Sequence, residues 1–265
     1  PFASIDSHDN ALEFGSLHGY PFVLKSRRNG YDGYGNATIR NADAIDEGWK
    51  KITRDADDVD LYAEDFVSFE SELAVMIARG RDGSIATYPL VETVQRSHIC
   101  HLVSVPARVD DDVARRAMQY ACGAVEAING VGIFGVELFV TGDGEVLVNE
   151  MAPRPHNSGH YTIEGCVTSQ FENHIRAVMG WPLGSTELRA PAVAMVNILG
   201  RGDESGMLDD YPSALANPRT HVHIYGKRES RIGRKMGHVT VLADTLEQAI
   251  AEAEASEKAV RFLPR

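Results

Sequence analysis

Short apolar runs separated by turn residues recur along the chain and predict a protein rich in β-strands. Two of the three Asp-Gly dipeptides, Asp82-Gly83 and Asp143-Gly144, each lie between two such runs. Because Asp-Gly suits the two central residues of a type I′ turn, each dipeptide predicts a β-hairpin. Buried strands are expected at residues 20–25, 61–63, 72–78, 85–91, 102–105, 131–140, 145–151, 193–199, 221–225 and 238–242.

The helix signal is strongest over residues 110–128, which begin with acidic residues, repeat apolar residues at helical spacing and stop at Asn129-Gly130. Further helices are expected at residues 43–52, 169–179 and 246–260, whereas the first four residues read as a loop. The mixture predicts an α+β fold. We expect a larger domain over residues 1–190 and a small β-rich C-terminal domain over residues 191–265.

Composition and charge argue against several classes of binding partner. The chain has 265 residues and a formal net charge of -12, so its overall field attracts neither nucleic acid nor anionic lipid, and we expect no binding to either. Its three cysteines form no Cys-x-x-Cys pair, and no apolar run approaches the roughly 20 residues that span a bilayer, which fits a cytoplasmic protein. Because Pro1 is not an initiator Met, we expect the chain to start partway through a larger protein.

The second hairpin predicts a pair of facing carboxylates. If Asp143 and Gly144 are its two loop residues, counting outward pairs Glu137 with Glu150. Carboxylates forced together between largely apolar strands repel each other, and a divalent cation relieves the repulsion. These hard oxygen ligands, with the amide of Asn149 beside them, suit Mg²⁺ better than zinc. The alternative is a solvent-facing edge on which the two carboxylates lie apart in water.

A glycine-rich loop follows the first predicted strand and contains Gly30, Gly33 and Gly35. Glycines let backbone N–H groups approach phosphate oxygens closely, and Lys25 on the strand is placed to neutralise their charge. The spacing matches neither the dinucleotide-binding fingerprint nor the P-loop. A plain surface turn is an equal alternative.

Polar side chains are concentrated in residues 152–160, directly after the predicted metal ligands. This loop contains Arg154, His156, Asn157, Ser158 and His160. The two histidines have metal-like spacing, but the neighbouring prolines argue against a helix and no third ligand is near. The composition therefore favours an anion-binding role over a zinc site.

A basic cluster lies within residues 225–238, where Lys227, Arg234 and Lys235 stand among glycines. In an acidic chain such a local positive patch favours phosphate recognition. A basic hairpin tip without a ligand is the alternative.

Taken in order, the motifs resemble one family, the 5-(carboxyamino)imidazole ribonucleotide synthetases of purine biosynthesis, which are ATP-grasp enzymes. The resemblance covers nearly the whole chain and is carried by VLKSRRNGYDGYG, LYAEDFV, ELAVM, YPLVETVQ, GVELFV, VNEMAPRPHNSGH, SQFENHIRAV, MVNILG, HIYGK and GRKMGH. The stretch YPLVETVQRSHICHLV is similar to the fungal form, in which a carboxyaminoimidazole mutase domain is fused downstream. The family also has an N-terminal domain, which would precede Pro1.

The resemblance implies an ATP-grasp fold that binds ATP between two α+β lobes. The nucleotide-binding residues that it implies are Lys25, Gly30, Tyr31, Asp32, Gly33, Gly35, Glu64, Val67, Glu72, Gln95 and Asn149. Glu64 and Val67 would lie at the adenine, Glu72 would hold the ribose hydroxyls, and Glu137 and Glu150 would carry Mg²⁺. Bicarbonate would be surrounded by Arg154, His156, Asn157 and Ser158. Aminoimidazole ribonucleotide would be contacted by Tyr31 and Asp32, with its phosphate at Lys227, Arg234 and Lys235.

Two positions depart from the family pattern: Tyr34 stands where Arg or Lys is usual, and Gln95 stands where some members have His. The implied reaction transfers a phosphoryl group from ATP to bicarbonate, after which the exocyclic amine of 5-aminoimidazole ribonucleotide attacks the activated carbon. ATP and Mg²⁺ are the implied cofactors, and a homodimer is the implied assembly. The alternatives are another ATP-grasp ligase, such as formate-dependent glycinamide ribonucleotide transformylase, and a nucleotide-binding remnant without catalysis.

Overall fold

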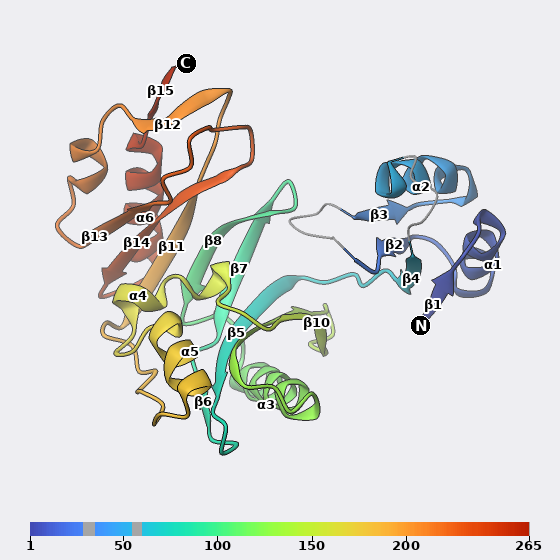
Figure 1. Cartoon of the computed structure of the whole chain (residues 1–265), viewed down its shortest axis with the longest axis horizontal. Helices are drawn as coiled ribbons and strands as arrows, with labels where there is room; N and C mark the ends of the chain where they lie inside the picture. The colour runs from blue at the N-terminus through green and yellow to red at the C-terminus, as the bar shows by residue number, and fades with distance from the viewer. Residues whose placement is uncertain (29–34, 55–59, 265) are drawn as a thin grey trace. The chain divides into compact units, whose positions relative to one another are not determined.

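The computed structural model describes residues 1–28, 35–54 and 60–264, and the chain forms two compact units (Figure 1). The first unit comprises residues 1–68 and 97–99, and the second comprises residues 69–96 and 100–265. Each unit has hydrophobic core residues of its own.

The first unit is a four-stranded sheet that carries two helices. Its strands are β1 (Phe2–Ile5), β2 (Phe22–Ser26), β3 (Asn36–Ile39) and β4 (Leu61–Asp65), in the order β1-β4-β2-β3. Its helices are α1 (His8–His18) and α2 (Ile45–Thr53), and the 3₁₀ turn η1 (Ala42–Ala44) precedes α2. Both helices pack on the sheet, where Phe14 of α1 and Ile45 of α2 share a core with Leu24 of β2.

The expected loop at the start of the chain is wrong, because residues 2–5 form the edge strand β1, which pairs antiparallel with β4. Helix α1 then begins after Ser7, whose hydroxyl accepts a hydrogen bond from the backbone N–H of Asn10 at 3.2 Å. A serine before a helix satisfies one of the free N–H groups of its first turn. Ser7 was therefore the overlooked signal, while a sparse apolar stripe on α1 concealed the helix.

The second unit is built on a nine-stranded sheet. Its strand order is β10-β9-β5-β7-β8-β11-β14-β13, with β6 also paired to β5. The strands are β5 (Ser71–Arg79), β6 (Ile85–Thr87), β7 (Val91–Arg96), β8 (Ile99–Val105), β9 (Gly132–Val140), β10 (Val146–Ala152), β11 (Ala192–Leu199), β13 (Thr220–Ile224) and β14 (Lys235–Ala243). A separate two-stranded sheet consists of β12 (Glu204–Leu208) and β15 (Phe262–Pro264).

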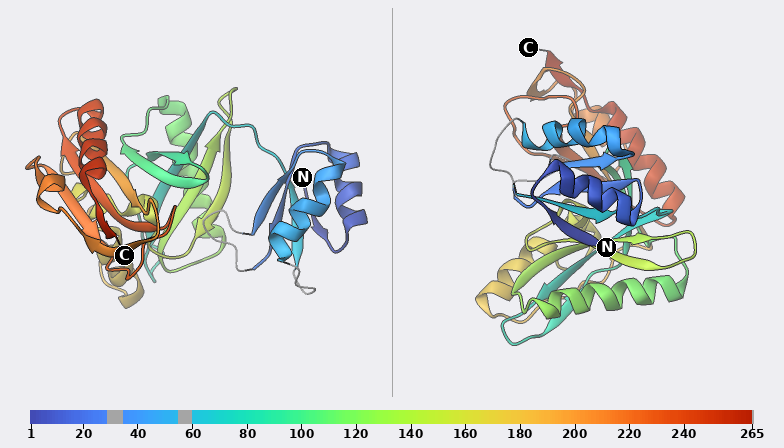
Figure 2. Two further views of the ribbon diagram at one scale, coloured as in Figure 1. Left: turned by 90° about the horizontal axis from the view of Figure 1, so that it is seen from above. Right: turned by 90° about the vertical axis from the view of Figure 1, so that its right-hand side faces the viewer.

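Alternation along the strands sends apolar side chains to both faces of this sheet. The helices of this unit are α3 (Asp111–Ala127), α4 (Thr162–Gly165), α5 (Gln170–Met179) and α6 (Leu246–Ala259), with 3₁₀ turns η2 (Asn157–Gly159) and η3 (Pro212–Leu215). On β5, Leu73 and Val75 pack with α3, whereas Ala74 and Met76 pack on the other face with Tyr161. Helix α6 lies along β11 and β14 and completes a third core (Figure 2).

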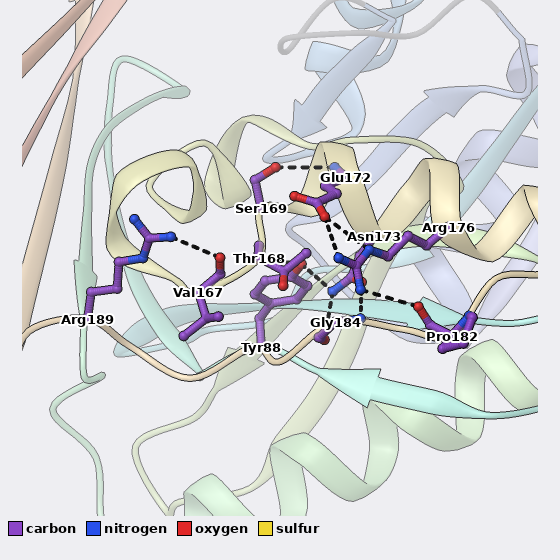
Figure 3. A network of polar contacts seen from close by, with 10 residues as sticks. All are labelled: Tyr88, Val167, Thr168, Ser169, Glu172, Asn173, Arg176, Pro182, Gly184 and Arg189. Carbon is purple, nitrogen blue, oxygen red and sulfur yellow. Dashed lines mark hydrogen bonds and ion pairs between the residues drawn. The ribbon is translucent and has the colours of Figure 1, made fainter.

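A buried polar network anchors α5 (Figure 3). The Asn173 side chain donates to the Tyr88 hydroxyl at 2.8 Å and accepts from the Gly184 N–H at 2.8 Å. Tyr88 in turn donates to the carbonyl of Thr168 at 3.0 Å. The helix is thus tied to the segments on either side of it by bonds between side chains and backbone.

Both Asp-Gly hairpins form, but the predicted two-residue turns are wrong. Around Asp143, the N–H of Thr141 donates to the carbonyl of Glu145, so three residues form the loop, and Gly144 has φ +80°. Gly83 has φ +84° in the matching position of the other hairpin. A three-residue loop ends with a residue in the left-handed conformation, and glycine supplies it without strain. The glycines mark the turns correctly, but as third loop residues.

The sheet continues across the predicted domain boundary at residue 190, since β11 pairs with β8 on one side and β14 on the other. The boundary itself stays a prediction. Within the described part of the chain, no helix is both long and apolar enough to cross a membrane.

Candidate active site

Glu137 and Glu150 lie directly opposite each other on β9 and β10, as the sequence predicted. Beside the turn the register pairs Val140 with Val146, which by itself would place Glu137 opposite Asn149. The register then shifts between Val148 and Glu150, and this β-bulge at Asn149 moves Glu150 into place. The longer turn and the bulge cancel, so the predicted pair is confirmed although its premise about the turn was wrong.

The surroundings of the pair are buried on one side and open on the other. Strand β10 is the edge of the sheet, and Glu150 is exposed, whereas the Glu137 side chain is only 26% exposed. Burial, followed by the charges of Glu150 and Glu72, raises the pKa of Glu137 to about 7. Glu137 is therefore not a carboxylate lying in water on a solvent-facing edge, and a cation beside it would favour its ionised form.

Glu72 lies on the same face of the sheet as Glu137. It is opposite Phe139 on β9, two residues from the partner of Glu137, and it faces Thr93 on β7. Burial raises the pKa of Glu72, and a hydrogen bond from the Gln95 side chain opposes that rise. The structure thus brings together Glu72 and Gln95, which the resemblance assigns to the nucleotide, beside the carboxylate pair.

The carboxylate pair suits Mg²⁺ by its donor atoms and by its mutual repulsion. Among the described residues no group of three or more His, Cys, Asp and Glu side chains is arranged to hold a metal, so Glu72 does not join the pair in one ligand cage. Mg²⁺ is commonly bound by one or two carboxylates together with substrate phosphates and water. Glu137 and Glu150 therefore fit a metal that arrives with a phosphate ligand.

The polar loop after β10 folds back over β9 and brings His156 to Glu137. His156 Nε2 lies 3.6 Å from Glu137 Oε1, and His156 Nδ1 lies 3.2 Å from Ser158 Oγ. Gly135 of β9 makes this approach possible, because a Cβ atom there would lie 2.6 Å from the Cβ of His156. The charge of Arg154 also acts on Glu137 and lowers its pKa, although the Arg154 side chain is exposed and donates to the carbonyl of Pro155.

Two buried amides outside the loop hold its backbone and side chains, and sequence reasoning assigned no role to either of them. Gln170 accepts from the His156 N–H at 2.9 Å and donates to the His156 carbonyl at 2.8 Å. Asn197 and Asn157 exchange hydrogen bonds between their side-chain amides at 2.7 and 2.9 Å. Asn197 is a single polar residue in the otherwise apolar strand β11, which was the cue available in the sequence. Gln170 stands among other polar residues and gave no such cue.

His160 is held as a neutral ring. Burial, with smaller effects from Lys235, His223 and Arg154, lowers the pKa of His160 to about 4. Its Nδ1 lies 3.0 Å from the Gln170 amide nitrogen, so the ring accepts there. The neutral ring gives an anion a hydrogen-bonding group but no positive charge, so the preference for an anion site over zinc in this loop stays a prediction.

The predicted basic cluster lies in the turn between β13 and β14. Lys227 Nζ donates to the carbonyl of Lys235 at 2.6 Å, and Arg234 donates to the carbonyl of Glu229 at 2.7 Å. The charge of Lys235 acts on both Glu137 and His160, lowering the pKa of each. Lys235, the first residue of β14, thus carries a charge that reaches Glu137 and the polar loop.

A separate group of predicted nucleotide-binding residues lies in the first unit. Lys25 on β2 forms an ion pair with Glu64 on β4, whose positions are diagonal neighbours in the sheet. Gly35 has φ +87°, a conformation that side chains disfavour, and Val67 is half-buried after β4. The remaining predicted residues of this group, Gly30, Tyr31, Asp32 and Gly33, lie outside the described residues, as does Tyr34.

Comparison with known proteins decides the family. The ATP-grasp domain profile matches residues 1–171, and the phosphoribosylaminoimidazole carboxylase C-terminal domain profile matches residues 193–252. The structure of N5-carboxyaminoimidazole ribonucleotide synthetase from Thermotoga maritima superposes with a TM-score of 0.85 at 41% identity, covering 100% of this chain and 68% of that one. The chain belongs to this ATP-grasp family. The family resemblance and the ATP-grasp fold predicted from the motifs are confirmed.

Two other members of the N5-carboxyaminoimidazole ribonucleotide synthetase family extend the comparison. Phosphoribosylaminoimidazole carboxylase of Ogataea methanolica is 45% identical over 248 residues, which is 92% of this chain and 45% of that protein. This chain therefore spans less than half the length of that relative. The synthase from Aspergillus clavatus in complex with ADP and 5-aminoimidazole ribonucleotide has a TM-score of 0.86 at 36% identity, covering 97% of this chain and 68% of that one.

Proposed function

We propose that the full-length protein containing this chain carboxylates 5-aminoimidazole ribonucleotide, using ATP and bicarbonate. The observation that carries the proposal is the Glu137–Glu150 pair with His156 beside it. The pair suits a metal ion that binds a phosphate, and His156 belongs to a loop rich in groups that can bind an anion. The Aspergillus clavatus relative, crystallised with ADP and 5-aminoimidazole ribonucleotide, supports the choice of ligands.

Nucleotide binding would draw on Lys25 for phosphate charge, and on Glu64, Val67 and Glu72 for the nucleoside. Gln95 would act through Glu72, to which it is hydrogen-bonded. The glycine-rich loop of residues 30–35 would contact the phosphates through its backbone. Mg²⁺, held by Glu137 and Glu150, would offset negative charge on the phosphoryl group as it transfers.

In the first step an oxygen of bicarbonate attacks the γ-phosphorus of ATP, the bond to the β-phosphate oxygen breaks, and ADP and carboxyphosphate result. Arg154 would supply positive charge for the bicarbonate, while His156, Asn157 and Ser158 would provide hydrogen bonds that orient it. Such positioning accounts for much of the catalysis in phosphoryl transfer. The approach of His156 to Glu137 supports a bicarbonate position beside the proposed metal.

In the second step the exocyclic amine of aminoimidazole ribonucleotide attacks the carbon, phosphate leaves with its electron pair, and the amine loses a proton. The product is the carbamate, 5-(carboxyamino)imidazole ribonucleotide. Tyr31 and Asp32 would contact the aminoimidazole. Lys227, Arg234 and Lys235 would hold the ribose phosphate. The proposal includes a cytoplasmic homodimer and a mutase domain downstream of Arg265.

The test is ATP hydrolysis by the purified full-length protein with each substrate omitted in turn. We expect ADP release to require both bicarbonate and aminoimidazole ribonucleotide. Turnover with formate and glycinamide ribonucleotide would replace the proposal by the transformylase activity. Nucleotide binding without turnover on either substrate pair would replace it by a binding function alone.

A further inference from the structure

The loop that carries the proposed bicarbonate residues is tied to two side chains that lie outside it and are fully buried. Gln170, the first residue of α5, and Asn197, on β11, are each 0% exposed. A buried amide loses its hydration and must find hydrogen-bond partners inside the protein. The partners of these two amides are concentrated in the loop, which points to a role in holding it.

Gln170 binds one loop residue at both of its backbone groups. Its Oε1 accepts from the His156 N–H at 2.9 Å, and its Nε2 donates to the His156 carbonyl at 2.8 Å. The same Nε2 lies 3.0 Å from Nδ1 of His160. The Gln170 side chain thus bonds both backbone groups of His156, as the backbone of a neighbouring strand would. It also orients the ring of His160.

The sequence around Gln170 is arranged to let its amide reach the loop. A Cβ atom on Gly159 would lie 2.6 Å from Gln170 Oε1 and 2.6 Å from Met76 Cγ, so glycine is required there for this packing. The backbone N–H of Gln170 donates to the Thr162 hydroxyl at 2.9 Å, and that hydroxyl donates to the carbonyl of Gly159. The loop and the start of α5 are therefore connected by a continuous set of bonds.

Asn197 performs the corresponding task for Asn157. Each amide donates to the other, and Asn197 also donates to the carbonyl of Cys100 at 2.9 Å. The neighbours of Asn197 along β11, Val196 and Ile198, are buried and apolar. An apolar residue would satisfy the packing of this strand, so the amide at this position is better explained by its bonds to Asn157 and Cys100.

We propose that Gln170 and Asn197 are positioning residues that hold His156 and Asn157 in the arrangement needed to bind and activate bicarbonate. The proposal rests on the proposed function for its substrate, but the hold on the loop is independent of it. Displacing a reacting group by about 1 Å can cost on the order of a hundredfold in rate. Loss of either amide should therefore act on bicarbonate more than on ATP.

The test compares Gln170→Leu and Asn197→Ala with wild type in the full-length protein. We expect the KM for bicarbonate to rise, or kcat to fall, by about ten- to a hundredfold, with the KM for ATP changed less than about threefold. Gln170→Glu keeps the size of the side chain but sets a buried carboxyl oxygen against the His156 carbonyl in place of the donor, so it should be at least as damaging as Gln170→Leu.

Asn173→Ala is the matched control. Asn173 is also a 0% exposed asparagine, but its partners are Tyr88 and Gly184, outside the loop (Figure 3). It should lower the melting temperature about as much as Asn197→Ala, yet leave both KM values and kcat within about twofold of wild type. Equal kinetic damage from both asparagine variants would show a general loss of stability and overturn the proposal.

Hydrogen exchange separates this proposal from the proposed function. In Gln170→Leu the His156 amide should exchange at least about tenfold faster than in wild type, while Asn173→Ala leaves it unchanged. Unchanged exchange together with unchanged bicarbonate kinetics would overturn the positioning role. If wild type lacks bicarbonate-dependent turnover, the proposed function fails and with it the link to bicarbonate, whereas the exchange rates still decide whether the amides hold the loop.

Discussion

Nε2 of His156 lies 3.6 Å from Oε1 of Glu137, so the polar loop after β10 meets the carboxylate pair on one face of the sheet. Gly135 on β9 has no Cβ that would clash with His156, and Gln170 at the start of α5 accepts a hydrogen bond from the His156 N–H. A carboxylate suited to a metal and a loop suited to an anion are therefore neighbours.

Glu150→Gln should reduce ATP turnover by at least about a hundredfold, because it removes one charge from the proposed metal position. The fold should persist, since Glu150 is exposed on an edge strand. Without Mg²⁺ the melting temperature should stay the same or rise, as repulsion with Glu137 is relieved. Glu145→Gln, at an exposed carboxylate of the same hairpin, is the control and should keep wild-type turnover.

The pH dependence of stability should reveal Glu137. Its pKa in the folded protein is about 7, above the ordinary 4.5, so the folded state binds this proton more tightly than the unfolded state. The stability from this group is present at low pH and is lost as pH rises from about 4.5 to about 7. Without Mg²⁺, the melting temperature of wild type should fall more across this range than that of Glu137→Gln.

Mg²⁺ should oppose the fall in melting temperature with rising pH, because it competes with the proton for the same carboxylates. Saturating Mg²⁺ should raise the melting temperature of wild type more at pH about 7.5 than at about 5.5. An equal Mg²⁺ effect in Glu137→Gln would remove the pair from the metal site.

Gly135→Ala should displace the loop, because the added Cβ would lie 2.6 Å from the Cβ of His156. Overpacking of this kind typically costs about 1 to 3 kcal/mol, and bicarbonate-dependent turnover should fall with it. Gly123→Ala is the control: the site lies on α3 with open space around it, so the alanine should stabilise the helix by about 0.5 to 1 kcal/mol. Wild-type turnover in Gly135→Ala would show that His156 need not lie over β9.

Arg234→Ala should raise the KM for aminoimidazole ribonucleotide by roughly ten- to a hundredfold and leave the KM for ATP nearly unchanged, if Arg234 binds the ribose phosphate. Its guanidinium, which has five N–H donors, donates one from Nη1 to the carbonyl of Glu229 in its own turn. Arg231→Ala, at an exposed arginine of the same turn, controls for the loss of charge. If both variants behave alike, the turn is a basic tip without a phosphate site.

Much of this arrangement could be read from local sequence patterns. Alternating apolar residues predicted the strands around Glu137 and Glu150, and the Asp-Gly pairs predicted the hairpins. The facing of the two carboxylates was predicted correctly because the extra loop residue and the bulge at Asn149 cancel. Neither deviation has a sequence signal strong enough to predict by itself.

The residues that support the site could not be predicted, because their roles depend on contacts between segments far apart in the sequence. Asn197 reaches Asn157 from β11 across 40 positions of sequence, and nothing in the local pattern of either residue points to the other. Gly135 and Gly159 read as ordinary strand and loop glycines. Their importance appears only when His156 and Gln170 are placed against them.

Oxygen transfer from labelled bicarbonate tests the central claim most directly. If bicarbonate attacks ATP at this site, phosphate released during carboxylation carries one oxygen from the bicarbonate. We predict that ¹⁸O-bicarbonate yields phosphate with one labelled oxygen per turnover in the wild-type full-length protein, and that Glu150→Gln yields almost none. Carboxylated product accompanied by unlabelled phosphate would contradict the account, because ATP would then have been hydrolysed without phosphorylating bicarbonate.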